Sequence, residues 1–356
     1  MTQRAASRAG LVSIPEPAGD VGPTGRLGRM GAAGRLGMVA LAALALASLP
    51  ITAAAAAPDT WPTRPLRLIV PYAPGGPTDI IGRLVARFAG EALGKPVVVD
   101  NRPGAGGTIG LSQALQAEPD GYTLALVAPG PIAGMPNLMK LPYAPDDVGY
   151  LTLAARTPSV IVVRSESGID SLAALIEQAR QHPGTMNYGS AGAGTTPHLG
   201  AELFKQEAKI DLVHVPYKGA APALAALMAG DVQMMMVDLL PVIPLAASGR
   251  LKILAVVSDR RVPGLPNVPT TAELGFPGVL MDANYGIIGP NGIPSGVQAR
   301  IVEAVRHAVA RPEMQAEMAK IGGTALTSTP AAYRDMTRVE FERWKRVVDK
   351  GRITLN

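Results

Sequence analysis

Two glycine-rich segments, each joining a short apolar run to a helical pattern, restrict the fold more than any other feature of the sequence. The first is Pro-Gly-Gly-Pro-Thr-Asp at residues 74–79, and the second is Gly-Ser-Ala-Gly-Ala-Gly-Thr-Thr-Pro-His at residues 189–198. Backbone N–H groups at the start of a helix lack intrahelical partners and carry a partial positive charge. Glycine lets a ligand approach those groups closely. The pair therefore predicts two lobes that hold one small anion between them.

Apolar runs alternate with amphipathic helical patterns along the chain after residue 60. The predicted strands cover residues 66–70, 97–99, 124–127, 159–163, 186–188, 212–215, 232–237, 252–257 and 285–288. The predicted helices cover residues 79–93, 108–117, 171–180, 197–207, 220–229, 296–310, 312–320 and 330–348. Such alternation is typical of parallel sheets covered by helices. We expect an α/β fold with its ligand beyond the carboxyl ends of the strands, where both glycine-rich segments fall.

Composition excludes several classes of function. The chain has no cysteine, which removes thiolate nucleophiles, cysteine-bound zinc, iron–sulfur clusters and disulfides. The four histidines do not show metal-ligand spacing, so neither a metal nor a cofactor is expected. Of the net charge of +5, residues 1–57 hold +3, from five arginines and two acids, which leaves +2 for the remainder. Without a basic stripe that interleaves with aromatics, a nucleic-acid partner is not expected.

The first 57 residues have the three parts of a secretory signal. A stretch with several arginines precedes an apolar run at residues 38–49, and alanines at 53–57 offer a cleavage region. The alternative is a membrane anchor, but the run is shorter than the ~20 apolar residues that span a bilayer. We expect residues 1–57 to be removed on export to the periplasm. Translation could also start at Met30 or Met38.

Hydroxyl side chains in the glycine-rich segments are candidate ligand contacts. Thr78 is expected to cap the first helix, and Thr196, followed by Pro197, is expected to cap the second. Ser190 and Thr195 add donors that can orient a carboxylate. The alternative for each segment is an ordinary strand-to-helix turn.

Two acidic residues adjoin the predicted site. Asp79 lies at the start of the first helical pattern, and Asp238 follows the strand predicted at residues 232–237. A carboxylate repels an anionic ligand, so these residues either cap helices or hold an ammonium group of the ligand.

Two further patterns suggest chemistry that the rest of the sequence does not favour. Residues 104–110 form G-x-G-x-x-x-G, but in the second strand–helix unit, so a structural turn is favoured over a dinucleotide site. Residues 189–192 are similar to a nucleophile elbow, but Tyr188 stands where the elbow has its leading glycine. An exported hydrolase that uses Ser190 is the alternative from another class.

The chain resembles the extracytoplasmic solute receptors of tripartite tricarboxylate transporters, also called Bug receptors. Long matches are Ile-Val-Pro-Tyr-Ala-Pro-Gly-Gly at 69–76, Val-Val-Asp-Asn-Arg-Pro-Gly-Ala-Gly-Gly at 98–107, Pro-Asp-Gly-Tyr-Thr-Leu at 119–124 and His-Val-Pro-Tyr-Lys-Gly at 214–219. Shorter matches continue to Val-Pro-Thr at 268–270. The resemblance covers nearly all of the chain after the signal.

The resemblance implies a non-enzymatic, two-lobed periplasmic binding protein of the Venus-flytrap type (type II-like). One lobe would comprise residues 58–163 plus 285–356, and the other residues 164–284. A small organic carboxylate would lie between them and pass to integral-membrane permease subunits, with the receptor a monomer. A receptor that presents its ligand to a signalling partner is the alternative. The ligand-binding residues expected are Tyr72, Pro74, Gly75, Gly76, Thr78, Asp79, Ala128, Ser190, Gly192, Gly194, Thr195, Thr196, His198, Tyr217, Asp238 and Tyr285.

Three positions near the expected cleft depart from the family's usual pattern. Pro77 replaces a small residue and removes one N–H donor. Tyr285 stands where a tryptophan is frequent, and residues 129–131 (Pro-Gly-Pro) form a stiffer loop. These departures leave the identity of the carboxylate open, whether dicarboxylate, tricarboxylate, amino acid or aromatic acid.

Overall fold

The computed structural model describes residues 60–320 and 322–355. The predicted export signal, with its cleavage region and the alternative starts Met30 and Met38, lies outside the described residues. Within the described ranges, no helix combines the length and apolarity needed to cross a membrane.

In the described part of the chain, ten strands form one connected sheet in the order β2-β1-β3-β9-β4-β7-β5-β6, with β8 and β10 also paired to β4. Their bounds are β1 (Leu66–Val70), β2 (Val97–Asn101), β3 (Thr123–Val127), β4 (Val148–Arg164), β5 (Asn187–Ser190), β6 (Val213–Pro216), β7 (Met234–Asp238), β8 (Leu251–Val256), β9 (Asp282–Pro290) and β10 (Thr324–Ala325). Strands β1, β2 and β3 pair in parallel, as do β5, β6 and β7. Strands β4 and β9 run antiparallel to their neighbours.

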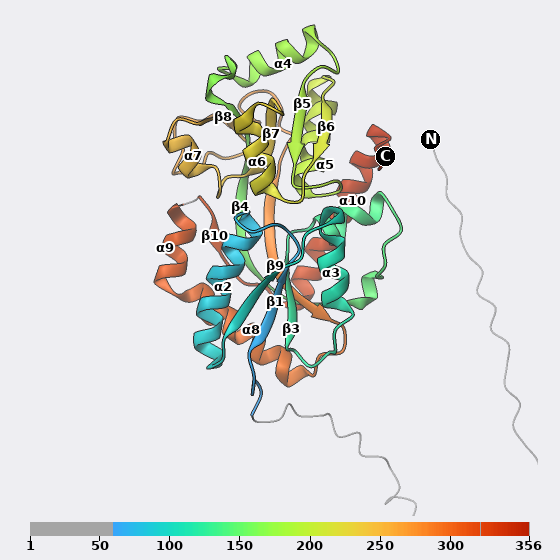
Figure 1. Ribbon diagram of the computed structural model, residues 1–356, viewed down its shortest axis with the longest axis vertical. Coiled ribbons are helices and arrows are strands. Elements are labelled where there is room, and N and C mark those ends of the chain that lie inside the picture. Colours follow the sequence, from blue (N-terminus) through green and yellow to red (C-terminus); the bar gives the residue numbers. More distant parts are fainter. Residues whose placement is uncertain (1–59, 321, 356) are drawn as a thin grey trace, which may run out of the picture. The chain divides into compact units, whose positions relative to one another are not determined.

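Helices connect the parallel strands and cover the sheet (Figure 1). They are α2 (Pro77–Leu93), α3 (Thr108–Leu115), α4 (Leu172–Gln181), α5 (Thr196–Ala208), α6 (Ala220–Ala229), α7 (Ile243–Ala247), α8 (Ser295–Ala310), α9 (Pro312–Lys320) and α10 (Pro330–Gly351). Short helical turns lie at η1 (Ala105–Gly107), η2 (Gly130–Gly134), η3 (Met135–Asn137), η4 (Pro145–Asp147) and η5 (Ser165–Ser167). The predicted α/β class is confirmed.

The two groups of parallel strands define two lobes. Lobe 1 contains β1–β3 with α2, α3 and α8, and lobe 2 contains β5–β8 with α4–α7 (Figure 1). Strand β4 belongs to both, because residues 148–158 pair with β9 and residues 159–164 pair with β7 and β8. The sequence predicts only residues 159–163 of this strand, since Gly149 and Pro158 disfavour an interior strand. The residue-level lobe boundaries given above stay a prediction.

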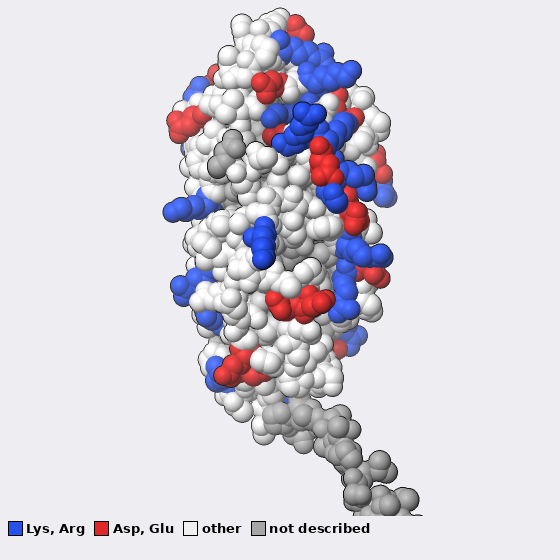
Figure 2. Space-filling view, turned by 90° about the vertical axis from the view of Figure 1, so that its right-hand side faces the viewer, with Lys and Arg blue, Asp and Glu red and all other residues white. Residues whose placement is uncertain are grey.

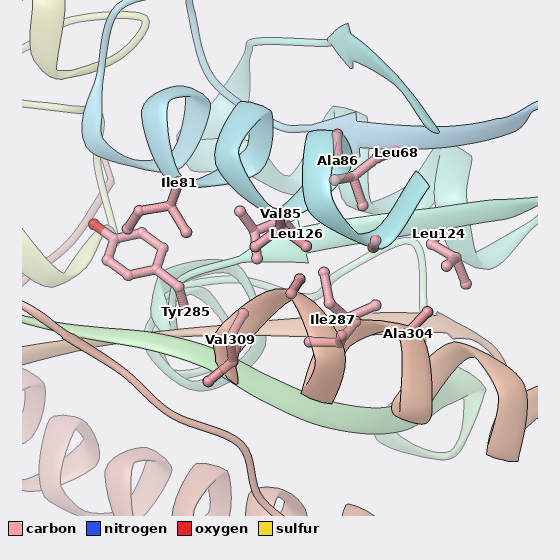
Figure 3. Close-up of a cluster of buried hydrophobic side chains, with 14 of the residues drawn as sticks. Leu68, Ile81, Val85, Ala86, Leu124, Leu126, Tyr285, Ile287, Ala304 and Val309 are labelled. Carbon is pink, nitrogen blue, oxygen red and sulfur yellow. The ribbon is translucent and has the colours of Figure 1, made fainter. Parts of the chain in front are cut away.

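Each lobe has its own apolar core. In lobe 1, Ile81 and Val85 of α2 pack with Leu126 of β3 and Ile287 of β9, and α8 packs beside α2 in the same cluster (Figure 3). Full burial of each such side chain contributes roughly 1.5–3 kcal/mol. Tyr285 of β9 belongs to the same cluster, so packing fixes the position of its ring.

In lobe 2, helices α4 and α5 cover one face of the sheet, with Leu175 and Phe204 among their buried residues. Helix α6 covers the opposite face through Leu224 and Leu227. Packing on both faces explains why the first four residues of β7, Met234–Val237, are all apolar and fully buried.

Charges of both signs share the surface drawn in Figure 2. Lysines and arginines alternate with aspartates and glutamates, and broad areas carry neither. This distribution agrees with the absence of a basic stripe in the sequence.

Candidate ligand-binding site

The two glycine-rich loops, together with the ends of β7 and β9, enclose a small cavity of about 30 Å³. Its lining residues are Tyr72, Gly76, Pro77, Thr78, Ala128, Ala191, Thr195, Thr196, Pro197, Ala220, Asp238, Ala283 and Tyr285. A volume of this size holds about two water molecules. The two lobes therefore lie close together and leave little room between them at the site.

Three helices begin at the cavity. Helix α2 comes from lobe 1, and helices α5 and α6 come from lobe 2. They contain 17, 13 and 10 residues. Each presents first-turn N–H groups and the positive end of its dipole, which favour an anion. Pro77 and Pro197 each remove one N–H from this set.

The two threonines at the start of α5 have different roles. The Thr195 hydroxyl donates to the Gly192 carbonyl oxygen at 2.6 Å and so shapes the loop. Thr196 is 3% exposed, and its Oγ1 has no hydrogen-bond partner among the described residues. A buried hydroxyl is ordinarily hydrogen-bonded, and Thr196 lines the cavity, so a bound ligand or water would satisfy it.

Asp238 ends β7 and is the one charged side chain among the described residues that line the cavity. Its Oδ2 accepts from the Tyr285 hydroxyl at 2.5 Å, and its Oδ1 accepts from the Ser159 hydroxyl at 3.2 Å. It forms no ion pair with any part of the chain that the structure describes. Burial raises the pKa of Asp238 to about 6, although both hydrogen bonds favour the ionised form.

Two tyrosines line the cavity beside Asp238. Burial and the Asp238 charge raise the pKa of Tyr285 well above its ordinary value, so its hydroxyl stays protonated and donates. Burial likewise raises the pKa of Tyr72, whose hydroxyl donates to the Gly106 carbonyl oxygen at 3.3 Å.

Asp79 holds the first loop in place. It accepts from the Gly75 N–H at 3.0 Å, from both Arg83 Nε and Nη2, and from Asn101 Nδ2. Although burial opposes ionisation, these bonds keep the pKa of Asp79 below its ordinary value. Asn101 also donates to the Tyr72 carbonyl oxygen at 3.1 Å. The Asp79 carboxylate is thus occupied by the protein itself, although it does not cap α2, whose N-cap Gly76 receives no side-chain hydrogen bond.

Ser190 and two histidines hold the second loop through hydrogen bonds and a ring contact. Ser190 Oγ lies 2.6 Å from His214 Nε2, and the His214 ring stacks on His198 with centroids 4.0 Å apart. His198 Nδ1 accepts from the Gly194 N–H at 3.0 Å. Burial lowers the pKa of His198 to about 4 and that of His214 to about 3. Ser190 is fully buried, which is unsuitable for a nucleophile that must reach a substrate.

Half of the residues predicted from the sequence line the cavity. These are Tyr72, Gly76, Thr78, Ala128, Thr195, Thr196, Asp238 and Tyr285. The others lie in the surrounding structure: Pro74, Gly75, Asp79, Ser190, Gly192, Gly194, His198 and Tyr217. All of them stay proposals for ligand contact.

Both predicted helix caps are wrong by one or two residues. Gly76 is the N-cap of α2, and the helix begins at Pro77, because proline at the first position has a helical φ and no N–H to satisfy. Thr195 rather than Thr196 is the N-cap of α5, which places Pro197 second in the helix, where it is tolerated.

Several small residues of the cavity wall were not predicted from the sequence. Ala220 begins α6 directly after Gly219, and a third strand-to-helix junction could have indicated it. Ala283 shares a face of β9 with Tyr285, as alternation along a strand predicts. Ala191 and Pro197 lie within the second loop itself.

The glycines assigned above to a structural turn also meet lobe 2. A Cβ on Gly106 would overlap the Ala193 carbonyl oxygen, and Gly192 lies against the Gly106 backbone. The Ala73 N–H donates to the Lys218 carbonyl oxygen at 3.1 Å, a second contact between the lobes. The contact between the two lobes therefore depends on the close approach of their backbones.

No group of acidic and histidine residues able to hold a metal occurs in the described ranges. A larger hollow of about 500 Å³ is bordered by Ile132, Met139 and Tyr143, but no residue predicted for the site lines it. The small cavity between the loops is therefore the better candidate for the ligand-binding site.

An α/β architecture with two lobes, shared strands and a cavity at three helix starts defines a periplasmic-binding-protein fold, the class of two-lobed solute receptors. The profile of the tripartite tricarboxylate transporter family receptor (TctC) matches residues 81–353. The chain belongs to this family of solute-binding receptors, which are not enzymes. Membership of this family excludes the alternative of a hydrolase that uses Ser190.

Relatives support the assignment. The chain is 35% identical to protein BugT of Bordetella pertussis, over 83% of this chain and 93% of that one. Among solved structures, Rpa4515 of R. palustris with adipate is 33% identical with a TM-score of 0.79, covering 83% of this chain and 99% of that one. MatC of Rhodopseudomonas palustris with bound malate is 29% identical with a TM-score of 0.78, covering 81% and 100%.

Proposed function

We propose that this protein captures a small organic carboxylate between its two lobes and delivers it to the integral-membrane permease subunits of a tripartite tricarboxylate-type transporter. The observation that carries the proposal is the meeting of helix starts from both lobes at one cavity, with the buried Thr196 hydroxyl unpartnered among the described residues. The malate and adipate in the relatives' structures are of this chemical class.

The ligand carboxylate would accept hydrogen bonds from the Thr78 and Thr196 hydroxyls and from first-turn N–H groups of α2, α5 and α6. Each helix contributes only the partial charge of its dipole, so the interactions that bind the carboxylate come from both lobes. Contacts that exist only when both lobes touch the ligand shift the population toward the closed form.

Capture requires the lobes to separate, because a cavity of about 30 Å³ does not admit an organic acid. Strands β4 and β9 are the segments that continue from one lobe to the other, and they would carry the hinge motion. We further propose that this cycle takes place in the periplasm, in line with the predicted export signal, and that the receptor acts as a monomer.

A thermal-shift screen of organic acids tests the proposal. The purified protein is first unfolded and refolded to remove any co-purified ligand. An acid present at about 100 times its Kd adds ~2.7 kcal/mol of stability and raises the melting temperature. If no dicarboxylic, tricarboxylic, amino or aromatic acid shifts the melting temperature, the proposed function fails.

A further inference from the structure

We propose that Asp238 forms a subsite that selects ligands with a hydrogen-bond donor, and an ammonium group above all, opposite their carboxylate. The inference rests on the proposed function, because it specifies which carboxylates the same cavity takes. Amino acids are the expected class.

The distribution of charge around the cavity supports this selection. Three helix starts favour negative charge on one part of the ligand. The described lining contains no lysine, arginine or histidine to neutralise a second carboxylate, and it contains one carboxylate of its own, Asp238. A zwitterion matches this arrangement, whereas a dianion places like charges together.

Asp238 is buried but keeps capacity for another donor. An ionised carboxylate offers about four lone-pair sites. Tyr285 and Ser159 occupy one site on each oxygen, and the nearby Thr157 hydroxyl can take a third, which leaves one site on a residue that lines the cavity. A buried carboxylate without a cation is costly, and an ammonium group of the ligand would supply the missing charge.

The neighbouring groups do not supply that positive charge. Tyr285 and Ser159 donate as neutral hydroxyls from β9 and β4. The Tyr72 hydroxyl, on the first loop, donates to the Gly106 carbonyl oxygen instead. Asp282 of β9 adds a further negative charge, which raises the pKa of Asp238 in the same direction as burial does. Asp238 is ionised at pH 8, so binding of a ligand without a donor requires the Asp238 carboxylate to take up a proton from the buffer.

Matched ligands test the subsite. Calorimetric titrations at pH 8 compare aspartate, malate and succinate, which differ by an ammonium, a hydroxyl or a hydrogen at one carbon, and likewise alanine, lactate and propionate. We expect the amino acid of at least one series to bind at least about tenfold more tightly than its analogue without a donor, as for hydrogen bonds to charged groups. Lowering the pH from 8 to 5.5 should strengthen binding of that analogue, with proton uptake from the buffer.

Asp238→Asn should reduce the ratio within that series to less than about threefold, because the charge that distinguishes the ligands is gone. Asp231→Asn, at an exposed carboxylate outside the cavity lining, is the matched control and should keep the wild-type ratio. If the Asp238 variant does not fold, the inference is still tested by the affinity ratios and the proton uptake measured with the wild-type protein.

Equal affinity of an amino acid and its donor-free analogue at pH 8 overturns the inference, as does an unchanged ratio in Asp238→Asn. Binding of other acids in the screen, with neither amino acid bound, overturns the inference and leaves the proposed function standing. Only the failure of every carboxylate in the screen removes both.

Discussion

The Tyr285 hydroxyl donates a 2.5 Å hydrogen bond to the Asp238 carboxylate and so joins β9 to the end of β7 at the cavity wall. The carboxylate is held in place by Tyr285 and Ser159, but no cation among the described residues pairs with it. This arrangement holds the Asp238 carboxylate in a position suited to contact a ligand, and it lowers the stability of the folded protein.

Replacing Asp238 by asparagine should stabilise the ligand-free protein at neutral pH. The folded pKa of about 6 lies above the ordinary value of 3.8, so the folded state binds more protons between these values. The associated stability is present below pH 4 and is lost as the pH rises through 6. Urea unfolding should therefore show Asp238→Asn more stable than wild type at pH 7.5, by up to about 3 kcal/mol, and equal near pH 4. A difference that does not change with pH contradicts the burial of an ionised Asp238.

Adding a side chain at Gly106 should weaken ligand binding, because its Cβ would overlap the Ala193 carbonyl oxygen of lobe 2. Gly94 is a matched control: its φ of 65° is close to the 63° of Gly106, and a Cβ there meets nothing within 4 Å. Both alanine variants should lose roughly 1–2 kcal/mol of stability from the left-handed conformation.

Only Gly106→Ala should also lower affinity, by about tenfold or more, for the tightest-binding acid of the screen, since it opposes the closed population. Calorimetry on both variants makes the comparison. Equal affinities in the two variants would show that approach of the Gly106 backbone to lobe 2 is not needed for binding.

His198 should make the protein sensitive to acid. Its folded pKa of about 4 lies below the ordinary 6.5, so the unfolded state binds more protons between these values. Stability is full above pH 6.5 and falls as the pH drops toward 4, by about 3 kcal/mol from this residue.

His198→Asn keeps an acceptor for the Gly194 N–H and should remove this part of the pH dependence. His307→Asn, on the exposed side of α8, should leave it in place. Urea unfolding between pH 7 and 4.5 measures the slopes. A wild-type slope in His198→Asn would assign the acid sensitivity to other groups.

Strong local patterns predicted most of the fold. The strands β1 and β3, the helices α2 and α6, and the two glycine-rich loops are each encoded by contiguous residues with a clear period or turn signal. The first half of β4 was missed because it contains glycine and proline, which tertiary pairing with β9 tolerates. Helix α7 was missed because five residues carry no measurable period.

The site was predictable only in part. Thr195, Thr196 and Asp238 were predicted because they lie in a strand-to-helix loop or at the end of a strand, and such positions can be read from the sequence. The partners that decide their roles are distant in sequence. Asp79 is locked by Asn101, 22 residues away, and Ser190 lies against His214, 24 residues away. Ala283 and Ala220 have no chemical signature that marks a cavity wall.

In the proposed function, one carboxylate is held by both lobes. Calorimetric titration of the refolded protein with the tightest-binding acid of the screen tests it most directly, using one variant per lobe. Thr78→Val removes a hydroxyl at the start of α2, and Thr196→Val removes one at the start of α5, both at the cavity wall. We predict one ligand per chain and an affinity lowered several-fold to about tenfold in each variant, as for loss of one hydrogen bond, with the melting temperature of the Thr196 variant unchanged. Wild-type affinity in either variant would contradict capture between the lobes.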